Sequence, residues 1–575
     1  MNCPSRTDPE ILDHPDWNQN PPQLNADVTT RQDLNGIANS REQRDNAAKT
    51  KGAGDDSFPA EVQQVQDTGD AEPKEKPSGE VILATTGPEQ PNCDSKSPRL
   101  PFITMINGFF LRIIQSVIKF ARFVGPGFLI AVAYIDPGNY ATDVAAGADR
   151  KYALLFVILM SNLFAIFLQS LCIKLGSVTG LNLAENCRAH LPKWLVIILY
   201  VFAEAAIIAT DIAEVVGSAI ALNLLLKIPL VAGCAITLVD VLFILIFYRP
   251  NGSMVGLRAF EFFVMALVLG VVVCFCIQLS LIRDQPVGEV FRGYVPSSAV
   301  IQGSGLYQSC GILGATVMPH SIFLGSGVVQ SRLKHFDVAQ GYVESTVPLG
   351  STGGEVEYRP SVEAIRNCLK YSIVELALSL FTFALFVNSS ILIVAGASLY
   401  GNSGASDADL FGIHKLLSSS IAPAAGTIFA LALLLSGISA GIVCTIAGQM
   451  VSEGMLRWSI KPWLRRLITR SISIVPSIAI AGAVGRDGLN TTLTASQVVL
   501  SVILPFVTAP LIYFTCRNRY MTVRTGEASG EENDANVEGV KMRNNWFVST
   551  LAVLIWLVIA VMNVALLVLV GQGEA

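Results

Sequence analysis

The sequence predicts an all-α integral membrane protein with eleven transmembrane helices, ten of them in two inverted repeats of five and one added at the end. Its composition is the first reason, because 51% of the 575 residues are hydrophobic and 15% are charged, whereas soluble domains carry about 25% charged residues. The second is a series of apolar segments long enough to cross a bilayer. The third is that two of these segments, five spans apart, are interrupted by glycine and proline.

Residues 1–100 are predicted to form a disordered cytoplasmic tail. The tail is rich in Asp, Gln, Asn, Pro, Ser and Lys and has no apolar period, so it cannot bury enough surface to fold. It lacks the start of a secretory signal, and the first span is therefore expected to serve as the targeting signal. The tail is either a solvated segment or a site for regulatory partners. No basic surface suggests a nucleic-acid partner.

Residues 101–575 form the predicted membrane domain, with repeat one at about 120–282, repeat two at about 300–517 and an extra helix at about 546–570. The expected spans are 123–147, 153–176, 194–222, 230–248, 257–280, 304–331, 371–398, 424–451, 467–486, 495–516 and 546–570. Most Lys and Arg of the connecting loops lie on one side, which the positive-inside rule makes cytoplasmic together with the N-terminus. Asn490, in Asn490-Thr491-Thr492, then falls on an outside loop and is a predicted glycosylation site.

The first interruption is Asp136-Pro137-Gly138-Asn139, and the second is Ala315-Thr316-Val317-Met318-Pro319-His320. Proline removes a backbone donor, so carbonyls just before each break lose their helical partners. Within a bilayer, such freed carbonyls are tolerated only where they line a cavity or hold an ion. Two interrupted spans at matching positions of two halves indicate an inverted repeat with its binding site at the midplane.

The side chains at the breaks predict a site for a soft divalent metal. A carboxylate such as Asp136 costs at least ~2.5 kcal/mol in the membrane unless it has a cation or a proton. Asn139 adds a neutral oxygen, and the carbonyls of Ala133 and Ala315 can complete the ligand set. The thioether of Met318 favours later, polarizable metals over Mg²⁺ and Ca²⁺. The alternative for Met318 is a flexible side chain that fills the core.

A second group of titratable residues predicts a path for protons. His320 is the only histidine inside a span, and its imidazole can either tune Asp136 or be a hydrogen-bonded core side chain. Three acids of the third span are spaced so that they share one helical face and can form a relay. Two arginines of the ninth span, four residues apart, either join this relay or anchor the helix at the cytoplasmic side. These residues are Glu204, Asp211, Glu214, Arg466 and Arg470.

With these motifs the chain resembles the NRAMP family of proton-coupled divalent metal transporters, and most of all its fungal Smf-type members. The resemblance covers about Gly125 to Val570. It implies a LeuT-like fold, with the metal held by Asp136, Asn139 and Met318 and the carbonyls of Ala133 and Ala315 assisting. It also implies that Gln497 approaches the metal when the outer side closes. The chain has Ser321 where the family more often has Asn, and residues 332–359 include a longer loop than compact bacterial members carry.

The resemblance implies a transporter and not an enzyme, with no resident cofactor. Mn²⁺ or Fe²⁺ would enter the cytoplasm by alternating access together with protons, in a plasma, vacuolar or endosomal membrane. Asp136 would accept the proton first, and the acids of the third span with Arg466 or Arg470 would release it. Metal ions, protons and membrane lipid are thus the expected partners.

Two other functions are left open by the residues, while Met318 argues against a third, an aluminium- or magnesium-selective relative. A sodium-coupled amino-acid transporter can use the same broken-helix architecture, although a substrate carboxylate would seek a positive helix end and not Asp136. A metal-sensing receptor on this fold is the other alternative, with the N-terminal tail as its output. Retention of both motifs favours transport.

Overall fold

The computed structural model describes residues 125–245, 254–283, 285–302, 304–344, 347, 349, 358–401, 410–456, 462–483, 485–523 and 539–572. The predicted N-terminal tail, residues 1–100, lies outside this part of the chain. The described residues are almost entirely helical, and one short antiparallel ladder joins β1 (Thr522–Val523) to β2 (Val540–Lys541).

The first predicted span consists of two half-helices, α2 (Pro126–Val132) and α3 (Pro137–Arg150). At the end of α2 the amides of Ala133, Tyr134 and Ile135 each bond to the carbonyl three residues earlier, which tightens the last turn. Pro137 then begins α3, because the first position of a helix needs no amide donor.

The rest of the predicted first repeat consists of helices of 8 to 34 residues. They are α4 (Leu155–Thr179), α5 (Leu183–His190), α6 (Lys193–Leu226), α7 (Leu230–Leu245) and α8 (Met254–Leu281). The connection to repeat two carries α9 (Val287–Gly293) and the 3₁₀ turn η1 (Ser298–Val300).

The predicted second repeat also begins with a broken helix. Its halves are α10 (Gly305–Thr316) and α11 (Pro319–Val328), separated by Val317 and Met318. The later elements are α12 (Gln330–Ala339), α13 (Val362–Ser379), the π-helical turn η2 (Leu380–Ala384), α14 (Leu385–Ser398), α15 (Leu410–Ser420), α16 (Pro423–Leu456), α17 (Pro462–Ala483) and α18 (Gly485–Thr515). The extra helix α19 (Trp546–Gln572) comes last.

Helices occur in all eleven predicted spans. Among the described residues, eight helical stretches are long and apolar enough to cross a membrane. The other three predicted spans are the broken pair α2 and α3, whose halves are too short alone, and α7 and α17, which run over residues whose side chains are not described. The predicted all-α membrane architecture is therefore confirmed.

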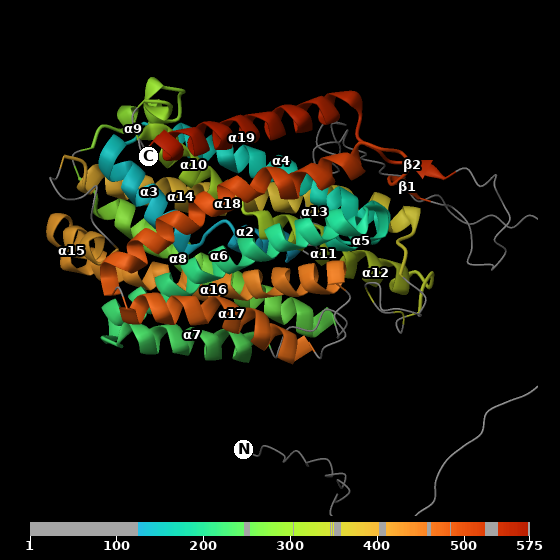
Figure 1. Cartoon of the computed structure of the whole chain (residues 1–575), viewed down its shortest axis with the longest axis horizontal. Helices are drawn as coiled ribbons and strands as arrows, with labels where there is room; N and C mark the ends of the chain where they lie inside the picture. The colour runs from blue at the N-terminus through green and yellow to red at the C-terminus, as the bar shows by residue number, and fades with distance from the viewer. Residues whose placement is uncertain are drawn as a thin grey trace, which may run out of the picture. The chain divides into compact units, whose positions relative to one another are not determined.

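The two broken helices lie inside the bundle. In Figure 1, α19 runs along one edge of the helical bundle, and α7 with α17 form the opposite edge. The half-helix α2 packs against α13 and α8, while α3 packs against α14 and α10. In repeat two, α10 packs against α18, and α11 against α4 and α16. The halves of the first broken helix thus differ in their main neighbours, whereas α10 and α11 both also pack against α4 and α18.

Some helices continue beyond the predicted spans, although the apolar stretch of the tenth span, Ala495–Thr515, agrees with its prediction. The tenth span was expected at 495–516, but α18 begins at Gly485, so Asn490 lies in the first turns of a helix and not in a loop. The apolar pattern marks only the part of a helix that matches hydrocarbon, and polar turns outside it carry no such signal. The side chain of Asn490 is outside the described residues, and its glycosylation stays a prediction.

Candidate metal site and buried charge network

Asp136 caps the N-terminus of α3. Its Oδ2 accepts a hydrogen bond from the amide of Gly138 (3.1 Å), and its Oδ1 accepts from the amide (3.1 Å) and the side-chain Nδ2 (2.6 Å) of Asn139. An anionic oxygen at a helix N-terminus is also favoured by the helix dipole. Both side chains are fully buried, and the Oδ1 of Asn139 has no hydrogen-bond partner among the described residues. The break thus presents one oriented carboxylate and one free amide oxygen.

The carbonyls of Ala133 and Ala315 lack a helical hydrogen-bond donor, and in both cases the cause is a proline four residues later. In a helix a carbonyl accepts from the amide four residues later, and that residue is Pro137 for Ala133 and Pro319 for Ala315. Proline has no N–H, and no other described residue donates a hydrogen bond to either oxygen. The two breaks therefore supply one unpartnered carbonyl each, at equivalent positions.

The neighbouring carbonyls of the first break are already used. Asn139 and Asn388 donate to the carbonyl of Tyr134, each at 3.1 Å, and Ser436 donates to that of Ile135 at 2.9 Å. Side chains from α3, α14 and α16 therefore hold the unwound segment in place. Because these bonds fix its backbone, the Ala133 carbonyl has a defined direction.

Hydrogen bonds join the two breaks. Ser321, on α11, donates to the carbonyl of Met318 (2.8 Å), and its Oγ lies 3.0 Å from the hydroxyl of Tyr134. The amide of Gln169, on α4, donates to both hydroxyl oxygens at 2.9 Å. Met318 itself is fully buried at the start of α11. The serine that departs from the family pattern is thus part of the contact between the breaks.

Gln497 also touches both broken helices. A Cβ atom at Gly138 would meet the side-chain amide of Gln497, and one at Gly314 would meet its backbone carbonyl oxygen. Gln497 is fully buried, and its Oε1 has no hydrogen-bond partner among the described residues. The absence of side chains at these glycines lets α18 approach the start of α3 and the end of α10.

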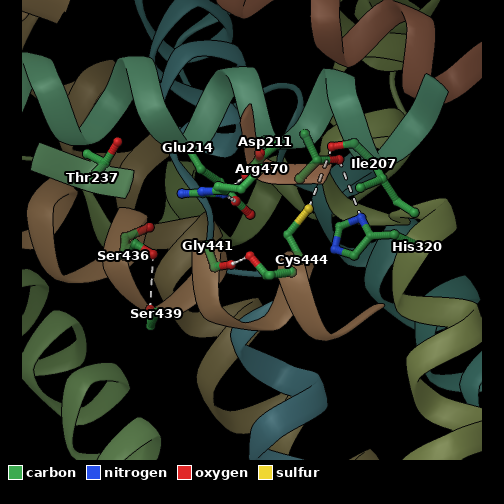
Figure 2. A network of polar contacts seen from close by, with 12 residues as sticks. Ile207, Asp211, Glu214, Thr237, His320, Ser436, Ser439, Gly441, Cys444 and Arg470 are labelled. Atoms are coloured by element: carbon green, nitrogen blue, oxygen red, sulfur yellow. Dashed lines mark hydrogen bonds and ion pairs between the residues drawn. The ribbon is translucent and has the colours of Figure 1, made fainter. Parts of the chain in front are cut away.

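The predicted proton-path residues fall into two groups. Arg470, on α17, forms ion pairs with Asp211 and with Glu214 (3.5 Å), both on α6 (Figure 2). The ring of His320 joins them indirectly, because its Nδ1 lies 3.3 Å from the Oγ1 of Thr210, beside Asp211. The side chains in this group are all at least 95% buried, namely Asp211, Glu214, His320 and Arg470.

Glu204 and Arg466 are not seen in this cluster. Glu204 lies seven residues before Asp211 on α6 and is half-buried. Arg466 lies on α17, but its side chain is outside the described residues. The structure thus brings Asp211, Glu214 and Arg470 together and leaves the roles of all five residues as predictions.

Asp143 was missed by the sequence analysis. It lies on α3, is fully buried, and neither carboxylate oxygen has a hydrogen-bond partner among the described residues. Its signal was available, because Asp143 stands seven residues after Asp136 and so on the same helical face, two turns away. Tyr134 and Gln169 were also missed, since nothing in the local pattern shows that distant polar side chains meet.

The breaks together offer oxygen ligands and one sulfur. The oxygens come from Asp136, Asn139 and the carbonyls of Ala133 and Ala315, and the sulfur comes from Met318. One carboxylate and one thioether suit a divalent ion of intermediate softness better than Mg²⁺, which prefers only oxygen ligands.

Comparisons with known proteins identify the family of the chain. Residues 127–528 match the family model described as Nramp, natural resistance-associated macrophage protein-like. The chain is 52% identical over 470 residues to the manganese transporter pdt1 of Schizosaccharomyces pombe, covering 82% of this chain and 89% of that protein. It is 54% identical over 416 residues to the iron transporter SMF3 of Saccharomyces cerevisiae, covering 72% and 85%.

A solved structure gives the same result for the fold. The manganese transporter of Eremococcus coleocola, crystallised with an aromatic bis-isothiourea substituted compound, matches with a TM-score of 0.63 and 32% identity. The match covers 77% of this chain and 85% of that one. From the matched family model and these relatives, the chain is a multi-pass membrane protein that belongs to the Nramp family.

Proposed function

We propose that the chain carries divalent transition metals, Mn²⁺ or Fe²⁺, into the cytoplasm by alternating access, together with protons. The observation that carries this proposal is the pair of matched breaks, each of which frees one carbonyl four residues before a proline. Asp136 with Asn139 stands at one break and Met318 at the other. Relatives named as manganese and iron transporters support the same substrates.

The geometry also favours this function over the other two. The negative side chain of Asp136 already occupies the N-terminus of α3, where a substrate carboxylate of an amino acid would bind. A receptor needs no path through the protein. In this chain the contact between Tyr134, which follows α2, and Ser321 of α11 joins the two breaks where a path would open. Movement of α2 and α11 would open that contact and release the ion.

Protons have a separate route in this proposal. Asp136 exchanges its proton for the metal, and His320 extends the route to α6, where its Nδ1 lies 3.3 Å from the Oγ1 of Thr210, the residue before Asp211. Arg470 sets the charge of this route through its two ion pairs. A membrane potential that is negative inside would add about 2.3 kcal/mol per elementary charge per 100 mV.

Uptake of Mn²⁺ into liposomes tests the proposal. Purified protein would be reconstituted around a divalent-sensitive dye, with and without an inward proton gradient and a negative potential. We expect uptake by the wild type, its loss in Asp136→Ala, and entry of Ca²⁺ in Met318→Ala because only oxygen ligands remain. Absence of uptake by folded wild-type protein would overturn transport and favour a receptor. Uptake that ignores the proton gradient would overturn the coupling alone.

A further inference from the structure

A thiol lies beside the two carboxylates that pair with Arg470. Cys444, on α16, approaches Asp211 and Glu214 on α6 so that one ligand atom from each residue lies within 4.8 Å of the others. All three side chains are at least 95% buried. Figure 2 shows Cys444 between the Arg470 ion pairs and the ring of His320. The three residues have the types and the spacing of a metal site.

The chemistry of this cluster differs from that between the breaks. The sulfur of Met318 is a neutral thioether, whereas a cysteine that binds metal does so as a thiolate. One thiolate with two carboxylates suits Zn²⁺ and softer ions such as Cd²⁺. At present the thiol of Cys444 points to the carbonyl of Ile207, with a sulfur–oxygen distance of 3.6 Å. A thiol is a weak hydrogen-bond donor, so a metal ion could replace this contact.

The charges of the cluster also leave room for a cation. Arg470 supplies one positive charge against two carboxylates, and Glu214 Oε1 has no hydrogen-bond partner among the described residues. An uncompensated buried charge is costly, so without metal the cluster must hold a proton on one carboxyl group. A divalent ion that displaces this proton and the thiol proton leaves the total charge unchanged. Metal binding is thus balanced by release of two protons.

We propose that Asp211, Glu214 and Cys444 form a second metal site, which takes a soft divalent ion such as Cd²⁺ or Zn²⁺. It is separate from the site between the breaks and goes beyond the transport proposed above. His320 marks the way between them, since it lies two residues after Met318 and its Nδ1 is 3.3 Å from Thr210. The bound ion competes with Arg470 for the two carboxylates.

Titration of the purified full-length protein with Cd²⁺ tests this site. A thiolate that binds Cd²⁺ gives a charge-transfer band in the ultraviolet, which a thioether does not give. We expect the wild type to show such a band and Cys444→Ser to lack it. By equilibrium dialysis, Cys444→Ser should bind one Cd²⁺ fewer per protein than the wild type. In a weakly buffered solution, Cys444→Ser should also release fewer protons per protein. Met318→Ala should keep the band, because it changes only the site between the breaks.

The controls make the result decisive. The other cysteines are present in both proteins, so they cancel in the difference between wild type and Cys444→Ser. Cys444→Ala serves if the serine variant does not give a single size-exclusion peak. An ultraviolet spectrum and a Cd²⁺ stoichiometry that do not change in either variant would overturn the second site. Neither result depends on uptake, so failure of this proposal and failure of transport are distinguishable.

Discussion

Glu375, on α13, caps the N-terminus of α2 by accepting a hydrogen bond from the amide of Gly125, with 2.6 Å between Oε1 and N. The same oxygen accepts from the amide of Gly127 at 3.0 Å. The first amides of a helix have no partner within it, so this carboxylate ties the half-helix to α13. Beside it, Arg332 of α12 pairs with Glu261 of α8 at 2.6 Å.

Gly125→Val should disrupt this junction. Gly125 has a φ of 156°, which disfavours other residues, and a Cβ atom there would meet Glu261 Oε2 and Arg332 Nη2. We expect a clear fall in the melting temperature of the detergent-solubilised protein. Size-exclusion chromatography after heating measures this temperature. Gly288→Val is the matched control, because nothing lies within 4 Å of its Cβ position. Equal melting temperatures for the two variants would contradict the packing argument.

Removing one partner of the Arg332–Glu261 ion pair should destabilise the protein more than replacing both partners. Arg332→Ala leaves Glu261 buried with less compensation, which typically costs about 3–5 kcal/mol. The double variant Arg332→Met with Glu261→Met keeps the volume and removes both charges, so it should be more stable than Arg332→Ala. Melting temperatures of the single and double variants give this comparison. A double variant that is less stable than Arg332→Ala would show that the charges themselves are required.

The junction around Gly125 shows which contacts a sequence pattern can predict and which it cannot. The breaks were predictable because Asp136-Pro137-Gly138 is a local signal, in which proline removes a donor and the carboxylate caps the second half-helix. The carboxylate of Glu375 was visible only as an acid inside a span. Its partner Gly125 is 250 residues away in the chain, and no local period relates two such positions. The same holds for Gln169 with Ser321 and for Cys444 with Asp211, which only the packing of long helices brings together.

Restoring an amide donor at either break should weaken metal binding. In Pro319→Ala the new N–H can bond to the carbonyl of Ala315, and in Pro137→Ala to that of Ala133, as in a continuous helix. A hydrogen bond to a charged group contributes roughly 1.5–3 kcal/mol, and we take the loss of one carbonyl contact to the metal to be at least as large as the lower end. We therefore expect the affinity for Mn²⁺, measured by calorimetry, to fall at least about tenfold in each variant.

The control for these variants is a proline within an unbroken helix. Pro476 lies inside α17, which packs mainly against α7 and α6. Pro476→Ala should leave the affinity for Mn²⁺ unchanged. If all three variants lowered the affinity equally, the effect would come from helix rigidity in general and not from the freed carbonyls.

Asp143→Asn should stabilise the metal-free protein. A buried carboxylate without partners is unfavourable when charged, whereas the amide is neutral and nearly the same size. Because Asp143 lies on the same face of α3 as Asp136, removal of its charge should also raise the KM for Mn²⁺ several-fold. Melting temperature and initial uptake rates test the two effects. A lower melting temperature would show that Asp143 has a stabilising cation partner beyond the described residues.

Outside the membrane, Asp337 organises the segment that leads into α13. Near the end of α12, it accepts hydrogen bonds from the hydroxyl of Tyr358 (2.7 Å) and from the hydroxyl (2.6 Å) and amide (3.0 Å) of Ser361. Ser361 in turn caps α13 through the amide of Ala364. The long connection after α12 is thus attached at its C-terminal end by one carboxylate.

Tyr358→Phe should lower stability in a manner that depends on pH. Burial, followed by the hydrogen bond to Asp337, raises the pKa of Tyr358 above its usual value of 10.0. The stability from its neutral form is therefore fully present below about pH 10 and declines at higher pH, where the unfolded chain loses the proton first. We expect Tyr358→Phe to cost about 1 kcal/mol near neutral pH, and its melting temperature to approach that of the wild type above about pH 10. Tyr342→Phe, which removes an exposed hydrogen bond to Glu363, should change little at any pH. A difference between wild type and Tyr358→Phe that stays constant through this range would rule out titration of the Tyr358 hydroxyl as its cause.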